Sequence, residues 1–332
     1  MPEDRFNSMN GSELSFKYYE SFGLPEFSSK YPELFPLLCF GLAGAGSECY
    51  GFDDELSQDH DFEPGFCVFY PEDKLDSRQV FALERTYAKL PKDFMGFSRS
   101  MIAPYGGERR RGVIGVNEFF SRYVPGGTVP SDPAGWAALR DELLCEALNG
   151  VVFSDNYGLF SEIRSGLRNV PDDIRKKRLS GLFFSLSQSG WYNVPRMLKR
   201  GDFGAVRLFL TDFVIDAAKC LYVLNDQFCP YKKWLLRGLK SLPVCGISDE
   251  LEALLNVDVN RQGRAMRELI CSVTERLLEM CSIKYGTVNT DGFLGTERSE
   301  PDGLRALQGA AFSLSGMISD NNLRNSDIML LV

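Results

Sequence analysis

The sequence predicts an α+β protein: a small mixed sheet with helices, followed by an all-helical bundle domain. Short apolar runs typical of buried strands occur up to about residue 116 and then nearly vanish. A segment dense in glycine and proline, 125–133, follows them and has the composition of a linker. Amphipathic helical patterns fill most of the remaining chain. We therefore expect two domains, 1–130 and 131–332.

The first domain begins with helical patterns. Residues 12–22 are amphipathic and end at Gly23, and a second short helix is expected over 27–34. The apolar run 36–43 is predicted to be a buried strand that leads into a glycine-rich turn. The other elements expected in this domain are strands at 58–63, 66–70 and 111–116 and helices at 75–89 and 117–124.

The second domain is expected to contain helices alone. The strongest pattern is 203–225, which carries one broad apolar face at helical spacing. That face consists of Val206, Leu210, Phe213, Val214, Ala217, Leu221 and Leu224. The other helices are expected at 134–148, 155–168, 172–189, 193–200, 231–240, 247–255, 261–284 and 303–318, with a polar loop over 285–302.

Composition and net charge argue against several classes of protein. The net charge of −8 argues against a general nucleic-acid or anionic-membrane binder, which needs a basic surface. The nine cysteines form no C-x-x-C pair and are expected to be free thiols in a reducing compartment. The first residues lack the pattern of a signal peptide, and no uncharged apolar run approaches the ~20 residues that span a bilayer. We therefore expect a cytoplasmic protein without a membrane partner.

A glycine-rich turn and a pair of acids are the most informative local pattern. The turn is Gly41-Leu-Ala-Gly-Ala-Gly-Ser47, and Asp59-His60-Asp61 follows it. On a strand, Asp59 and Asp61 share one face and His60 points the other way, as a core histidine would. Small residues let backbone N–H groups approach phosphate oxygens, and two converging carboxylates favour Mg²⁺. The alternative is an ordinary tight turn followed by two solvated acids.

These residues resemble the signature of the nucleotidyltransferase superfamily, which includes DNA polymerase beta and the aminoglycoside nucleotidyltransferases. The sequence around these residues is more similar to a bacterial nucleotidyltransferase-like family known as domain of unknown function 4037. The resemblance runs from about residue 15 to about residue 245. The similar stretches are GAGSECYGFDDELSQDHDFEPGFCVFY (44–70), LNGVVFSD (148–155), PDDIRKKRLS (171–180), SQSGWYNVPRMLKRGD (187–202) and LNDQFCPYKKW (224–234).

The resemblance implies a nucleotidyltransferase-type sheet and a role for each matched residue. Gly46 and Ser47 would hold the terminal phosphates of ATP or another nucleoside triphosphate. Asp59 and Asp61 would bind one or two Mg²⁺ ions during attack on the α-phosphate, with pyrophosphate leaving. The superfamily usually places a third acid on a later strand. Residues 111–116 contain none, although acids flank this run and Glu63 lies two residues beyond Asp61.

Further candidates lie in the helical domain. Asp212, Asp216 and Lys219 share a face at helical spacing. In aminoglycoside nucleotidyltransferases an acid of the helical domain deprotonates the acceptor hydroxyl, so the resemblance implies this catalytic part for Asp212 or Asp216, with Lys219 near the phosphates. A solvated helix face is the alternative.

Two residues after this helix are expected to bind the nucleotide. Tyr231 or Trp234 could stack on the base, and Lys233, in the Lys-Trp pair that the resemblance shares, could contact a phosphate. The alternative places Lys233 on a solvated face with Trp234 in the core.

The expected function is therefore a Mg²⁺-dependent nucleotidyltransferase that moves a nucleoside monophosphate, AMP from ATP, onto a hydroxyl of a small molecule or a protein. The missing third acid leaves open a non-catalytic nucleotide-binding or regulatory module on the same fold. The basic runs Arg109–Arg111 and Arg175–Arg178 are expected to be solvated edges, although they leave open an RNA-modifying transferase or toxin.

Overall fold

A computed structural model describes residues 9–58, 62–99, 110–286 and 300–332, which form two compact units. The first contains residues up to Pro130 together with Leu143–Asn169, and the second contains Ser131–Glu142 and Val170–Val332. The division thus falls at Pro130, inside the expected linker, but the chain returns to the first unit after it has begun the second. The expected division into 1–130 and 131–332 differs from this one by the returning segment.

The first unit is built on a four-stranded mixed sheet with the order β5-β2-β1-β6. Its strands are β1 (Cys39–Leu42), β2 (Cys67–Tyr70), β5 (Gly112–Gly115) and β6 (Val151–Asp155). β1 is antiparallel to both of its neighbours, with Phe40 opposite Val68 on β2 and Ser154 on β6. β5 runs parallel to β2. With the helical second unit, this sheet confirms the predicted α+β class.

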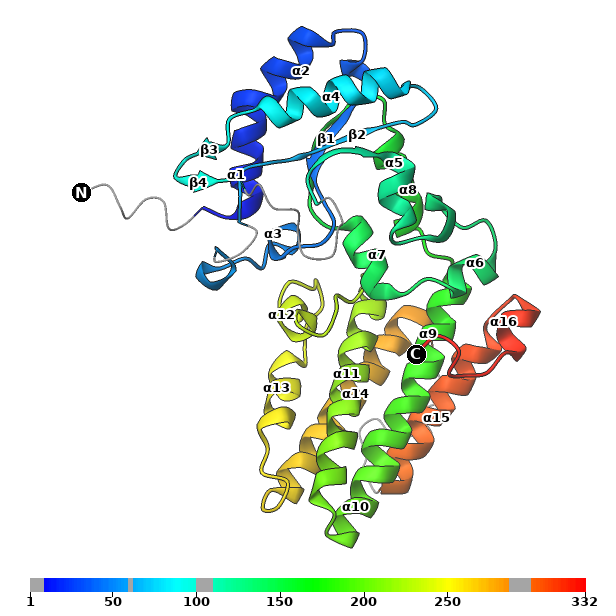
Figure 1. Ribbon diagram of the computed structural model, residues 1–332. Coiled ribbons are helices and arrows are strands. Elements are labelled where there is room, and N and C mark those ends of the chain that lie inside the picture. Colours follow the sequence, from blue (N-terminus) through cyan, green and yellow to red (C-terminus); the bar gives the residue numbers. More distant parts are fainter. Residues whose placement is uncertain (1–8, 59–61, 100–109, 287–299) are drawn as a thin grey trace. The chain divides into compact units, whose positions relative to one another are not determined.

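Helices cover both faces of the sheet (Figure 1). On one face, Phe40, Val68 and Val113 pack into a buried cluster with Tyr18 and Leu83, which come from the helices of that side. The helical segments of this face are α1 (Gly11–Tyr18), the π-helix η1 (Tyr19–Gly23), α2 (Leu24–Lys30) and α4 (Ser77–Lys89). α4 begins at a capping box in which the Asp76 side chain accepts the backbone N–H groups of Arg78 and Gln79.

The other face is closed by an aromatic cluster. Phe69 of β2 stacks on Phe160 at 4.2 Å between ring centroids and meets Phe119 edge-on at 5.0 Å. These partners come from α8 (Leu159–Arg168) and α5 (Val116–Ser121). Because neighbouring side chains of a strand alternate between faces, Val68 and Phe69 hold the two helical layers against opposite sides of one sheet.

The remaining elements of the first unit are short. They are α3 (Ser47–Tyr50), the 3₁₀ turns η2 (Phe35–Leu37), η3 (Glu55–Gln58) and η4 (Pro125–Gly127), and the hairpin of β3 (Asp93–Phe94) and β4 (Phe97–Ser98). α7 (Asp141–Leu148) begins in the second unit and continues into the first. The strand expected at 58–63 is wrong at its described positions, because Gln58 ends η3 and residues 62–63 have no regular structure.

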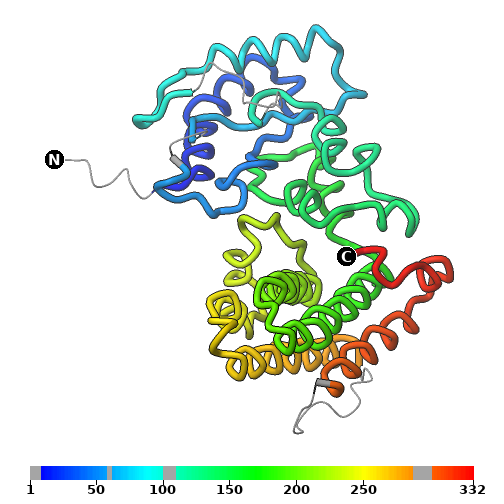
Figure 2. Tube along the Cα trace, turned by 60° about the horizontal axis from the view of Figure 1, so that its bottom comes forward, coloured from blue at the N-terminus to red at the C-terminus, as the bar shows by residue number. Residues whose placement is uncertain are grey.

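The second unit is a helical bundle whose core lies around α11 (Phe203–Leu224). Figure 2 looks nearly along this yellow-green helix and shows α9 (Asp172–Leu186), α13 (Ser248–Asn256) and α14 (Gly263–Tyr285) around it, all of which contact it. α15 (Glu300–Gly316) packs against α9 and α14. The whole predicted apolar face of α11 is buried, which confirms that helix and its orientation.

Short segments complete the bundle. They are α6 (Pro133–Ala137), the π-helix η5 (Ser187–Asn193), α10 (Val194–Arg200), α12 (Leu235–Leu239) and α16 (Asn321–Asn325). η5 joins α9 to α10, so the two helices expected at 172–189 and 193–200 are one helical path that widens before Pro195. In the described chain, no helix has both the length and the apolar composition that crossing a membrane requires.

Candidate functional site

The predicted glycine turn forms directly after β1. Gly44 has φ 104° and Gly46 has φ 132°, values that favour glycine, and Ser47 begins α3. Space is also restricted there. A methyl group added at Gly46 would lie 2.5 Å from a carboxylate oxygen of Glu48, and one at Gly44 would lie 2.9 Å from the hydroxyl of Tyr123. The backbone conformation therefore favours glycine at both positions, and a side chain at either one would also have to displace the Glu48 carboxylate or the Tyr123 side chain.

The returning segment before β6 holds this turn in place. The Asn149 side chain accepts the N–H of Gly44 at 2.8 Å and donates to the carbonyl of the same residue at 2.7 Å. The N–H of Gly150 donates to the carbonyl of Cys49 in α3 at 2.7 Å. The turn and the first residues of α3 are thus fixed by a segment about 105 positions later in the chain.

Arg164 of α8 binds the segment that holds the glycine turn. Its Nη2 donates to the carbonyls of Leu148 and Asn149, the second at 2.8 Å. The side chain is buried, and desolvation lowers the pKa of its guanidinium to about 10. Because this buried guanidinium binds the carbonyls of Leu148 and Asn149, it limits the movement of Asn149, whose side chain holds Gly44. No local sequence pattern identified Asn149 or Arg164, because both act through contacts that are distant in sequence.

We expect replacement of Asn149 by alanine to loosen the glycine turn. It removes both hydrogen bonds to Gly44 and should lower the free energy of unfolding by about 2 kcal/mol. Urea denaturation measures this. The control is Asn256→Ala, because among the described residues the Asn256 side chain donates only to the carbonyl of Glu252 on its own exposed helix turn. Equal losses in the two variants would contradict a special role for the Asn149–Gly44 pair.

A nearly buried ion pair joins α3 to Arg111, the residue that precedes β5. Arg111 Nη2 lies 3.2 Å from Glu48 Oε1, and both side chains are about nine-tenths buried, with exposures of 8% and 10%. Arg111 Nη1 donates to the Glu63 carbonyl at 2.6 Å and lies 3.5 Å from its carboxylate. Arg111 therefore connects the residue after Ser47 with Glu63.

The predicted metal ligands Asp59 and Asp61, and His60 between them, lie outside the described residues. Three described acids lie near the glycine turn, the predicted metal ligands or β5 in the sequence. Arg111 engages Glu48 and Glu63, and Glu118 lies 2.8 Å from Arg122. The described residues contain no group of three or more histidine, cysteine and acidic side chains that could hold a metal. The predicted Mg²⁺ site at 59–61 is not tested by that observation.

The two candidate bases on α11 differ in their surroundings. Asp212 is exposed, whereas Asp216 is buried and accepts a 2.6 Å hydrogen bond from the Ser185 hydroxyl of α9. Burial raises the pKa of Asp216 to about 6, although the hydrogen bond from Ser185 and the charge of Lys219 act in the opposite direction. Asp216 is thus an interior acid held between two helices.

Replacement of Asp216 by asparagine should make stability less dependent on pH. Because an unfolded aspartate has a pKa of about 3.9, the folded protein binds this proton more tightly, and ionisation of Asp216 costs stability as the pH rises from about 4 through 6. Asp216→Asn keeps an acceptor for Ser185 and removes the charge. We expect it to exceed the wild type in free energy of unfolding by about 2 to 3 kcal/mol at pH 7.5 and to match it near pH 4.

Urea denaturation at the two pH values measures the difference. Asp212→Asn, one turn earlier on the exposed face, is the matched control and should show no such change between them. A stability difference between Asp216→Asn and wild type that stays constant with pH would contradict the raised pKa.

The other helical candidates lie in two places. Lys219 lines a cavity of the second unit. Lys233 is exposed and lies over the ring of Trp234 at 4.7 Å, and the Tyr231 hydroxyl accepts the indole N–H of Trp234 at 3.1 Å. Trp234 is 6% exposed, as the structural alternative for the Lys-Trp pair expected. Tyr231 and Lys233 are therefore organised around one buried tryptophan.

The basic run 175–178 is used for internal contacts. Arg175 lies 3.1 Å from Asp226 and Lys176 lies 2.6 Å from Asp172. Lys177 is buried and donates to the Ser326 carbonyl at 2.9 Å, and Arg178 pairs with Asp141. The expectation of a solvated edge is wrong for Lys177 and Arg178. These contacts also weaken the observation that motivated an RNA-binding alternative.

Comparison with known families matches part of the chain. Residues 136–235 match the family described as Domain of unknown function (DUF4037). We refer to residues 136–235 as the DUF4037 segment. It includes Asn149 and Arg164 of the first unit and all the candidate residues of the helical domain from Asp212 to Lys233. No curated protein and no solved structure matches the chain.

Proposed function

We propose that this protein is a Mg²⁺-dependent nucleotidyltransferase that transfers a nucleoside monophosphate, AMP from ATP, to a hydroxyl of a small molecule or a protein. The observation that carries the proposal is the turn after β1, where Gly44 and Gly46 both have positive φ and Ser47 begins α3. Such a turn can present backbone N–H groups and a hydroxyl to phosphate oxygens.

The chain's own residues would act mainly by positioning. Gly46 and Ser47 would bind the terminal phosphates, while Asn149 keeps the turn in shape through Gly44. Asp59 and Asp61 have the carboxylate oxygens that Mg²⁺ prefers, and the ion would neutralise charge as pyrophosphate leaves. A transfer that depends on orientation and charge neutralisation needs no histidine base, and the chain has a single histidine.

Binding and turnover test this proposal separately. Isothermal titration with ATP, with and without Mg²⁺, should show metal-dependent binding that the variant Ser47→Ala weakens by about tenfold. The full chain should then release pyrophosphate from ATP when an acceptor is supplied. Absence of ATP binding under both conditions would refute the proposal.

A non-catalytic nucleotide-binding module is the second candidate. It is favoured by β5, whose four residues Gly112–Gly115 are all buried and include no acid. A missing third carboxylate would weaken deprotonation of the acceptor and binding of a second metal ion. Metal-dependent ATP binding without pyrophosphate release, across a panel of hydroxyl-containing acceptors, would favour this module over the transferase.

A further inference from the structure

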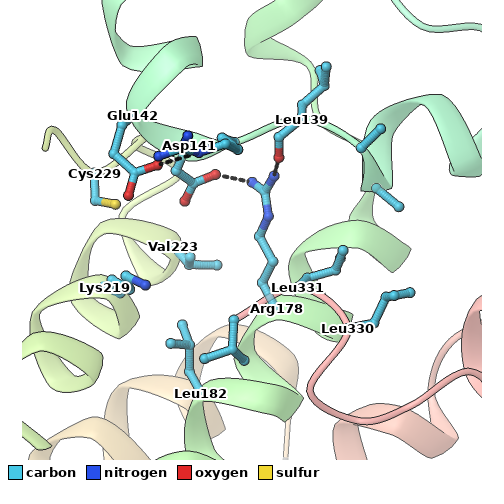
Figure 3. Close-up of a pocket in the computed structure, with 14 residues that line it drawn as sticks. Leu139, Asp141, Glu142, Arg178, Leu182, Lys219, Val223, Cys229, Leu330 and Leu331 are labelled. Atoms are coloured by element: carbon cyan, nitrogen blue, oxygen red, sulfur yellow. Dashed lines mark hydrogen bonds and ion pairs between the residues drawn. The ribbon is translucent and has the colours of Figure 1, made fainter. Parts of the chain in front are cut away.

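A cavity of about 340 Å³ lies wholly within the helical unit (Figure 3). Its walls come from residues 137–142, from α9 and α11, from Cys229 and from residues 330–332. Apart from residues 330–332, every lining residue belongs to the DUF4037 segment. The volume lies in the range of small-molecule sites, which is about 300 to 1,000 Å³.

Charges of both signs line this cavity. The charged side chains are those of Arg140, Asp141, Glu142, Arg178 and Lys219. Val332 is the last residue of the sequence and also lines the cavity, so its carboxylate adds a third negative charge to the three positive ones. Because the charges balance, the cavity can select a ligand only by where the ligand's polar groups lie, and not by its net charge.

Four of these side chains form ion pairs in the wall. Arg178 Nη1 lies 2.5 Å from Asp141 Oδ1, and Arg178 Nη2 donates to the Leu139 carbonyl at 3.1 Å (Figure 3). Arg140 Nε lies 3.7 Å from Glu142 Oε2, and the Arg140 side chain is 71% exposed. The two contacts of Arg178 join α9 to residues 139–141 and hold Asp141 at the cavity.

Asp141 has an oxygen that no hydrogen bond satisfies. Its Oδ1 lies close to Arg178, but the contact lacks the geometry of a hydrogen bond, and no described residue donates to this buried atom. The Asp141 side chain is only 15% exposed, and burial raises the pKa of its carboxyl even though Arg178 opposes the shift. A buried acceptor without a donor is unfavourable, so a ligand that donates a hydrogen bond to Asp141 would be stabilised.

Lys219 of α11 supplies donors to the same cavity. Its charge is shared, since it acts on both Asp141 and Asp216. Within the described part of the chain, however, no hydrogen bond uses the N–H groups of its ammonium, and Asp216 accepts its hydrogen bond from Ser185 instead. Lys219 therefore lies within electrostatic reach of Asp141 and can donate to an acceptor on a ligand that also reaches Asp141.

The rest of the wall is largely aliphatic. It includes Leu182 of α9, Val223 of α11, Leu330 and Leu331 (Figure 3). We infer that this cavity binds an α-amino acid with a branched aliphatic side chain. The ligand's ammonium donates to Asp141, its carboxylate accepts from Lys219, and its side chain packs on the aliphatic wall. Such a ligand has no net charge and carries both polar groups on one carbon, as the balanced and neighbouring charges of the wall require. This assignment does not depend on nucleotidyl transfer.

Methyl-resolved NMR of the full chain tests the assignment with L-leucine and two analogues that each lack one polar group. 4-Methylpentanoate has the same carbon skeleton without the ammonium, and 3-methylbutylamine lacks the carboxylate. We expect L-leucine to cause saturable shifts of the Leu182, Val223 and Leu331 methyl groups. Each analogue should bind about tenfold more weakly or worse, because it leaves Asp141 or Lys219 without its partner.

A lysine variant tests the carboxylate contact from the side of the protein. Lys219→Met should weaken the affinity for L-leucine by about tenfold or more, because it removes the donors and keeps the apolar stem. It should not weaken the affinity for 3-methylbutylamine, which has no carboxylate. Lys232→Met, which removes an exposed lysine outside the cavity lining, is the matched control and should bind L-leucine as the wild type does.

A second pair of variants fills space without changing charge. Val223→Phe should weaken binding because its side chain occupies the cavity, whereas Leu208→Phe, at a position of the same helix that is 69% exposed, should not. Thermal melting confirms that each variant is folded. The inference is overturned if L-leucine shifts none of the three lining methyl groups, if either analogue binds as tightly as L-leucine, or if the folded Lys219→Met variant binds L-leucine as well as the wild type does.

Discussion

Replacement of Asp59 or Asp61 by asparagine is expected to reduce nucleotidyl transfer by about 10³-fold or more, since each change removes a carboxylate charge that would hold Mg²⁺. Asparagine preserves the size of the side chain, so the melting temperature should change little. The measurement is transfer of label from α-³²P-ATP to an acceptor, together with pyrophosphate release.

The control for this pair is Glu55→Gln. Glu55 is an exposed acid on η3, four residues before Asp59, and its replacement removes one negative charge from the same stretch, as each aspartate variant does. It should retain transfer. Full activity of both aspartate variants would show that these residues are not the metal ligands.

Replacement of Gly150 by alanine should destabilise the first unit by about 3 kcal/mol. Gly150 has φ 73°, and a methyl group there would lie 1.9 Å from the Leu42 carbonyl and 2.8 Å from the Ala43 Cα. Both neighbours are backbone atoms at the end of β1, so they cannot move away without displacing the strand and the glycine turn. Urea denaturation should show the loss, and ATP affinity should fall with it.

Gly158 provides the matched control because it has φ 85° but nothing within 4 Å of an added methyl group. Gly158→Ala bears only the conformational cost, about 1 kcal/mol, and should leave ATP affinity unchanged. Equal losses in the two variants would mean that positive φ alone, and not the close approach to Leu42, restricts Gly150.

Strong local patterns made most of the fold predictable. The apolar face of 203–225 and the runs at 36–43, 66–70 and 111–116 correspond to α11, β1, β2 and β5. β6 was not predicted because it lies at the edge of the sheet and none of its residues is buried, with Val151 48% exposed. A half-exposed strand has no clear alternation of apolar and polar residues. Its absence from the prediction also concealed the return of residues 143–169 to the first unit.

The candidate site was predictable only in its local part. Gly46 and Ser47 were identified from glycine spacing, and the structure places them in the turn that this spacing requires. Asn149, Arg164 and Arg111 support that turn and α3 through contacts between distant parts of the chain, which a single sequence does not reveal. The sequence also does not distinguish Asp212 from Asp216, which lie one helical turn apart, although the structure buries Asp216 and exposes Asp212.

The most direct test of the central claim is a crystal structure of the protein with Mg²⁺ and a non-hydrolysable ATP analogue. We predict that the terminal phosphates contact the backbone of Gly46 and the Ser47 hydroxyl, with carboxylate oxygens of Asp59 and Asp61 on the metal. A nucleotide bound elsewhere, with the glycine turn and both aspartates free of phosphate and metal, would contradict the claim.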